Sequence, residues 1–188
     1  MILDIVKYGN PVLRQKGERV ESITSEITKL IDDMLETMRS AHGIGLAAQQ
    51  IGHKLQLATV DVTGVEDRPS RMEVNNENVD PEDYMPLILL NPEWTAVGET
   101  TDTGPEGCLS FPEIYGDINR PEEIEVKAMN EKGDNIKFRC GGLLSRAIQH
   151  EYDHLHGILF IDRMDALVRS NLKSDIDIIQ SNTKKLLD

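Results

Sequence analysis

The stretch GGLLSRAIQHEYDHLHG, residues 141–157, decides the fold because it predicts a helix bounded by glycines at both ends. Within it, His150, Glu151 and His154 form the pattern H-E-x-x-H. Residues four apart share one helix face, about 5–6 Å apart at Cβ, so both imidazoles can reach one metal ion. Glu151 lies about 100° round the helix and can serve as a general base without being a ligand. The alternative is a surface helix with two solvated histidines.

A catalytic metal site usually has three protein ligands and one open position. The histidine that would complete a metzincin site is replaced by Phe160, and no glutamate follows Glu151. A cysteine is the next option, although a thiol is often just a small buried side chain. The aspartates after the motif are options too, although aspartate is mostly a surface charge. The residues alone therefore leave the third ligand open among Cys108, Cys140, Asp162, Asp165, Asp175 and Asp177.

The rest of the chain predicts an α+β fold. Apolar residues at helical spacing predict an amphipathic helix over residues 24–41, with Thr24 or Ser25 as its N-cap. Residues 55–62 and 86–94 are expected as strands, and the alternation around residues 130–133 predicts a β-hairpin. We expect short, mostly antiparallel strands around the metal-ligating helix.

Two further segments are predicted from their composition and spacing. Residues 63–86 are polar and acidic and are expected to form a surface loop or insertion. Residues 164–188 predict an amphipathic C-terminal helix, with a break near Ser174. The 188 residues suit a single domain.

Charge and hydropathy exclude several classes of protein. A formal net charge of −13 argues against broad binding to nucleic acid, which needs a basic surface. No apolar run approaches the ~20 residues that span a bilayer. The start, MILDIVKYGNPVLR, lacks the pattern of a secretory signal. We therefore expect a cytoplasmic protein with no membrane partner.

Three segments resemble the signature motifs of the peptide deformylase family, in the family's order. They are GIGLAAQQ at 43–50, EGCLS at 106–110 and QHEYDHLHG at 149–157. The opening ILDIVKYGNPVLR and the segment LILLNPE are also similar to that family, so the resemblance spans nearly the whole chain except 63–86 and the tail. It implies a partly open α+β fold and hydrolysis of the N-formyl group from the initiator methionine of new polypeptides, with release of formate.

The resemblance also implies the metal site. It assigns Cys108 as the third ligand, beside His150 and His154. Members of the family commonly use Fe²⁺, and Zn²⁺, Ni²⁺ or Co²⁺ can occupy the same ligands. Gln49 stands where proline is frequent in the family, whereas the functional glutamine is retained as Gln50.

The remaining roles are expectations built on that resemblance. Glu151 takes a proton from water and passes it to the departing amine. The side-chain amide of Gln50 and the backbone N–H of Leu109 hold the oxyanion. We expect Glu106 to make structural hydrogen bonds beside Cys108. The expected substrate-binding residues, which also suit a helix end or the core, are Gly43, Ile44, Gly45, Gly107, Leu143 and Ala147.

Two other functions remain open at this point: a zinc endopeptidase, and a non-enzymatic module with a structural metal. The resemblance makes an N-formylmethionyl peptide the expected substrate. It also implies weak association with the ribosome, since some relatives dock there through a C-terminal helix. Residues 163–188 carry five Lys or Arg and four Asp, which gives weak support to such a contact. No specific nucleic acid is expected.

Overall fold

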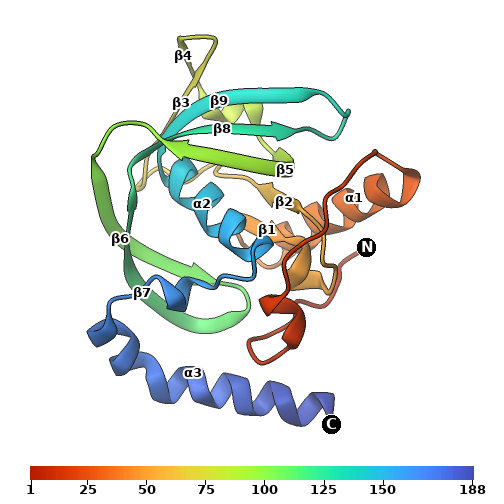
Figure 1. Ribbon diagram of the computed structural model, residues 1–188, viewed down its shortest axis with the longest axis vertical. Coiled ribbons are helices and arrows are strands. Elements are labelled where there is room, and N and C mark those ends of the chain that lie inside the picture. The colour runs from red at the N-terminus through yellow and green to blue at the C-terminus, as the bar shows by residue number, and fades with distance from the viewer.

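The helix at the centre of the molecule is α2, Leu143–Leu155. The computed structural model describes residues 1–188. Figure 1 shows α2 between a large sheet on one side and the separate pair β6 and β7 on the other. Every residue of α2 except Tyr152 is buried. The helix is therefore part of the core, and the alternative of a surface helix with solvated histidines is wrong.

The large sheet has seven strands in the order β1-β2-β5-β8-β9-β3-β4. Each pair of neighbours in it is antiparallel. This confirms the predicted α+β class with mostly antiparallel strands. The strands are β1 (Gly45–Ala47), β2 (Leu57–Val60), β3 (Ser70–Val74), β4 (Glu77–Val79), β5 (Leu87–Ala96), β8 (Glu123–Met129) and β9 (Asn135–Gly142).

The second sheet is the antiparallel pair β6 (Thr101–Cys108) and β7 (Phe111–Pro121). A turn of two residues, Leu109 and Ser110, joins the strands. Neither strand is predicted from the sequence. Its glycines, prolines and charges obscure the alternation of a sheet that is buried on one side only.

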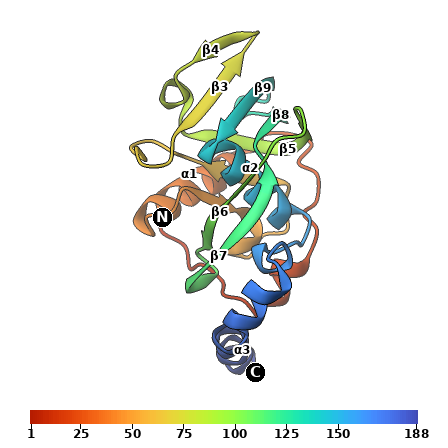
Figure 2. The same cartoon turned by 90° about the vertical axis from the view of Figure 1, so that its left-hand side faces the viewer.

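Two further helices complete the fold. Helix α1, Ser25–Ser40, is confirmed, and the predicted cap Thr24 accepts a 3.2 Å hydrogen bond from the N–H of Ile27. Helix α3, Ala166–Leu187, is continuous, so the break expected near Ser174 is wrong. Figures 1 and 2 show α3 at one end of the molecule, where it contacts β7. Short 3-10 turns lie at Pro11–Arg14, Ala48–Ile51, Pro81–Tyr84 and Phe160–Asp162.

Residues 63–86 differ from the expected loop, because β3 and β4 lie within them. The Met72 side chain of β3 is 3% exposed and belongs to the core, and β3 pairs with β9. Asn75 and Asn76 make the turn between the strands at φ of 53° and 63°, the backbone region that a tight hairpin turn requires. The Asn-Asn pair is the feature of the sequence that could have predicted this hairpin turn.

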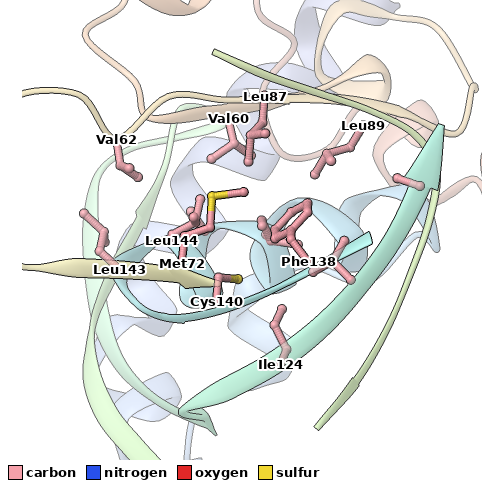
Figure 3. Close-up of a cluster of buried hydrophobic side chains, with 14 residues drawn as sticks. Val60, Val62, Met72, Leu87, Leu89, Ile124, Phe138, Cys140, Leu143 and Leu144 are labelled. Carbon is pink, nitrogen blue, oxygen red and sulfur yellow. The ribbon is translucent and has the colours of Figure 1, made fainter. Parts of the chain in front are cut away.

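The core between α2 and the large sheet contains 14 buried residues, drawn in Figure 3. Cys140 is one of them and is 2% exposed. Its thiol packs among apolar side chains from β3, β8 and α2, including Met72, Ile124 and Leu144. A separate cluster holds α1 against the other end of the sheet, at β1, β2 and β5.

Candidate metal centre

The start of α2 is fixed by β3, which lies beside it. The Ser70 hydroxyl accepts a 3.0 Å hydrogen bond from the Leu144 N–H, and the Pro69 carbonyl accepts one of 3.1 Å from Leu143. The helix follows Gly142, whose φ of 70° suits glycine, and which has no side chain to act as a cap. These bonds replace the missing cap and set where the later turns of α2 lie.

Cys108, His150 and His154 come together at the centre of the molecule. Their candidate ligand atoms lie within 4.8 Å of one another. Cys108 Sγ lies 3.4 Å from His154 Nε2, and the two imidazole centroids are 5.1 Å apart. Cys108 is brought there by the end of β6, and the histidines by successive turns of α2. The structure therefore contains a possible Cys/His/His metal site.

The other third-ligand candidates lie elsewhere. Cys140 is in the apolar core, and Asp162 pairs with Arg14. Asp165 precedes α3 as its N-cap, and Asp177 pairs with Lys173 on the exposed face of that helix. None of them belongs to a His/Cys/Asp/Glu group that could hold a metal, a condition that only Cys108, His150 and His154 meet.

The chemistry of the three side chains fits a divalent transition metal. Imidazole and thiolate are ligands for Fe²⁺, Zn²⁺, Co²⁺ and Ni²⁺, and three protein ligands leave a position for water. Burial lowers the pKa of His154 well below its usual value, so its ring is neutral, as a ligand must be. His154 Nδ1 and Glu151 Oε2 are buried here without a protein hydrogen-bond partner, as expected where water or an ion completes a polar site.

His150 is oriented by a buried carboxylate. Its Nδ1–H donates a 2.8 Å hydrogen bond to Glu106 Oε1, which leaves Nε2 free for a metal. Burial would raise the pKa of Glu106, but hydrogen bonds from His150 and Arg120 hold it far below its usual value. Glu106 is therefore ionised at neutral pH. The structural hydrogen bonds expected of Glu106 beside Cys108 are therefore present.

Three arginines bind two buried carboxylates, Glu106 and Asp153. Arg120 donates to Glu106 at 2.5 and 2.9 Å and to Asp153 at 3.0 Å. Arg146 donates to Glu106 at 2.9 Å and to the carbonyl oxygens of Asp102 and Ile118 at 2.8 Å. Arg163 donates to Asp153. This network ties α2 to β6 and β7, and so sets the position of Cys108 relative to both histidines.

Glu151 is 4% exposed and lines the cavity beside the candidate ligands. Burial raises the pKa of its carboxyl group to about 7. A group that titrates near neutrality can both accept and release a proton. Gly45 lies directly against it, and a methyl group there would overlap the Glu151 carboxylate. This close approach explains why the second glycine of GIGLAAQQ carries no side chain.

Gln50 and Leu109 line the same cavity as Cys108 and His150. Gln50 Oε1 accepts a 2.9 Å bond from the Ala47 N–H, and its Nε2 donates at 3.2 Å to the Ser110 hydroxyl. That nitrogen is 3.5 Å from Cys108 Sγ. The Leu109 N–H donates to no protein acceptor. Gln50 Nε2 therefore lies beside the sulfur of Cys108, and the Leu109 N–H belongs to the residue that follows Cys108.

A cavity of about 460 Å³ opens at this site. All six residues expected to bind substrate line it, as do Gln50, Leu109 and Glu151. A methyl group at Gly107 would lie 2.6 Å from the Tyr115 ring, so glycine is needed there for close packing. Several lining residues are not predicted from the sequence, because no short motif marks them: Lys7, His42, Arg68, Glu113, Tyr115 and Arg146.

No helix of this chain is both long enough and apolar enough to cross a membrane.

Comparison with known proteins gives one family. The sequence model described as "Polypeptide deformylase" matches residues 2–170. A protein named peptide deformylase from Opitutus terrae is 44% identical over 185 residues, which cover 98% of this chain and 96% of the relative. One from Methylacidiphilum infernorum is 42% identical over 180 residues, which cover 96% of this chain and 94% of the relative.

Solved structures that resemble this chain are also peptide deformylases. A plant peptide deformylase, PDF1B, superimposes with a TM-score of 0.83 at 31% identity and covers 97% of this chain and 91% of its own. A peptide deformylase from Synechococcus elongatus, in complex with actinonin, superimposes with a TM-score of 0.78 at 38% identity and covers 94% of this chain and 85% of its own. On this likeness in sequence and structure, the chain belongs to the polypeptide deformylase family.

Proposed function

We propose that this protein hydrolyses the N-formyl group from the N-terminal formylmethionine of newly made polypeptides and releases formate. Membership of the family supports the reaction. The observation that carries it here is that Cys108, His150 and His154 come together beside a cavity lined by Cys108, His150 and Glu151. Such an arrangement suits the addition of water to an amide.

Cys108, His150 and His154 are the proposed ligands of one divalent metal, and Fe²⁺ is the ion proposed for the cell. Zn²⁺, Co²⁺ and Ni²⁺ suit the same ligands. When bound, such a metal lowers the pKa of a coordinated water from 15.7 toward ~7 and so provides the nucleophile near neutral pH. Glu106 keeps His150 in the tautomer that binds through Nε2.

Glu151 is the proposed proton carrier. The oxygen of water adds to the formyl carbon, the C–N bond breaks, and the amine leaves with one more proton. Glu151 takes that proton from water and delivers it to the nitrogen. Its buried carboxyl group, with a pKa of about 7, suits both steps.

Gln50 Nε2 and the Leu109 N–H are the proposed donors to the oxyanion of the tetrahedral intermediate. Both lie beside Cys108, and the Leu109 N–H has no competing acceptor in the protein. Fixed donors of this kind stabilise charge that develops only as the reaction proceeds.

Ile44, Leu143 and Ala147 are the proposed apolar contacts for the methionine side chain. They line one cavity with Glu151, although Ile44 precedes β1 and the other two lie on α2. Gly43, Gly45 and Gly107 are proposed to let the peptide backbone approach closely. Side chains at these positions would meet Leu109, Glu151 and Tyr115.

The proposed setting is the cytoplasm, where new chains emerge from the ribosome. We propose that residues 1–188 act as a single catalytic domain and associate weakly with the ribosome through α3. Four large apolar side chains of α3 are exposed: Leu167, Ile178, Leu186 and Leu187. The helix therefore offers both apolar and charged surface to a partner.

The experiment that tests this function compares three matched peptides. A formyl-Met tripeptide, its acetyl counterpart and its free-amine counterpart are incubated with metal-loaded protein, and formate and peptide fragments are measured. We expect formate from the first peptide alone, with every internal bond intact. Cleavage of internal bonds would instead establish an endopeptidase, and the absence of any product with metal bound would leave a structural metal site.

A further inference from the structure

The segment from Val6 to Tyr8 bonds to the two segments that carry the proposed oxyanion donors, which are the 3-10 turn with Gln50 and the turn of Leu109 and Ser110. The Val6 N–H donates a 2.8 Å hydrogen bond to the Gln50 carbonyl, and the Tyr8 N–H donates one of 3.0 Å to the Ser110 carbonyl. These residues belong to no helix or strand. Because their backbone bonds to both Gln50 and Ser110, it fixes the distance between the 3-10 turn Ala48–Ile51 and the turn that follows Cys108.

Apolar packing anchors the same segment. The Tyr8 ring stacks on Phe111 with centroids 4.8 Å apart and planes at 23°. Phe111 is 1% exposed and begins β7, directly after the turn of Leu109 and Ser110. The backbone around Lys7 is therefore held independently of the Lys7 side chain.

The Lys7 side chain points to the cavity. Its ammonium donates a 3.0 Å hydrogen bond to the Leu109 carbonyl and lines the cavity with Gln50 and Cys108. It pairs with no carboxylate, although the protein carries a net charge of −13. The Leu109 carbonyl accepts no backbone hydrogen bond, so Lys7 is its one partner in the protein. Burying a lysine that has no carboxylate partner is costly unless its charge serves the site.

Leu109 is thus held at three points. Its side chain packs against Gly43, where a methyl group would lie 2.7 Å from Leu109 Cδ1. Its carbonyl is bound by Lys7, and the next residue, Ser110, is bound by Tyr8 and Gln50. Only the Leu109 N–H is left without a protein partner. Of these contacts, the bond from Lys7 is the one that can be removed by changing a single side chain without altering the backbone or the buried core.

We propose that Lys7 is a positioning residue for deformylation: it binds the Leu109 carbonyl and so holds the turn in which the preceding peptide, Cys108–Leu109, presents its N–H to the developing oxyanion. This inference rests on the proposed function and adds Lys7 to it. Fixed donors act on the transition state more than on the bound substrate, so loss of Lys7 lowers kcat and leaves KM nearly unchanged. The positive charge of Lys7 beside the site also stabilises the negative charge that develops on the oxyanion, so its loss lowers kcat as well.

The test compares Lys7→Met, Lys7→Arg and the control Lys127→Met, which removes an exposed lysine on β8. With a formyl-Met tripeptide, Lys7→Met is expected to lower kcat about tenfold or more and to change KM by less than about twofold. Lys7→Arg restores most of kcat because it keeps the donor and the charge. Metal content and thermal midpoint stay as in the wild type for all three.

A second measurement does not depend on activity. In zinc-loaded protein labelled with ¹⁵N-leucine, Lys7→Met is expected to shift the Leu109 amide resonance, while Lys7→Arg and Lys127→Met leave it near its wild-type position. An unchanged Leu109 resonance in Lys7→Met overturns the proposal, whether or not the wild type deformylates peptides. So does a kcat of Lys7→Met within about twofold of wild type, or a loss that Arg does not restore.

Discussion

Glu106 Oε1 lies 2.8 Å from His150 Nδ1, and this bond joins the strand that carries Cys108 to the helix that carries both histidines. Glu106 stands two residues before Cys108 on β6, and its carboxylate also accepts hydrogen bonds from Arg120 and Arg146. One carboxylate therefore orients a proposed ligand and also fastens the two elements that build the site.

Replacing Glu106 with Gln is expected to weaken metal binding about 10–100-fold. The neutral amide is a poorer acceptor for the His150 N–H, and it removes the negative charge that faces the two buried arginines. Competition with a chromophoric chelator measures the change. Glu77→Gln, which removes an exposed carboxylate on β4, is the matched control. Equal metal affinity in the Glu106 variant and the control would contradict this role.

Glu151→Gln is expected to retain one metal per chain but to lose activity by about 10²–10⁴-fold, the usual contribution of a positioned acid or base. The side chains are nearly the same size, so the buried position stays filled. Metal analysis and formate release from a formyl-Met peptide are measured on one preparation. Full activity in this variant would remove Glu151 from the mechanism.

The two cysteines are expected to behave in opposite ways. Cys108→Ser weakens or changes metal binding, since a hydroxyl is a poorer ligand than a thiolate. Cys140→Ser keeps the metal but costs about 1–3 kcal/mol of unfolding free energy, because the hydroxyl has no partner in an apolar core. Metal content and urea unfolding of both variants check this, and the reverse pattern would refute the choice of ligand.

Ser70→Ala is expected to lower the free energy of unfolding by about 1 kcal/mol, because it removes the acceptor for the Leu144 N–H at the start of α2. Ser22→Ala changes an exposed serine outside any helix or strand and serves as the control. Urea unfolding measures both. Equal stability of the two variants would show that the Ser70 side chain does not cap the helix that carries His150 and His154.

The sequence predicts what depends on local periodicity. The 3.6-residue repeat fixes His150 and His154 on one face, and alternation around residues 130–133 predicts the hairpin of β8 and β9. The third ligand depends on a contact between distant segments, so the residues alone left Cys108 and Cys140 equivalent. Only the resemblance separated them, and the structure then placed Cys108 beside the histidines.

The elements that the sequence did not predict depend on tertiary contacts. Strand β3 buries one apolar residue, Met72, and is held mainly by its neighbour β9. Arg120 and Arg146 are each 5% exposed, although arginine is mostly a surface residue, because each is paired with buried acceptors. Lys7 lies 102 residues from its partner Leu109, in a segment without secondary structure.

One metal, held by Cys108, His150 and His154, is proposed to make this chain a deformylase. The most direct test of this proposal is an anaerobic titration of metal-free protein with Fe²⁺, with formate release from a formyl-Met peptide measured at each step. The account predicts no activity without metal and a linear rise that ends at one metal per chain. Formate release that is independent of added metal, or none at all from protein with one metal bound, would contradict it.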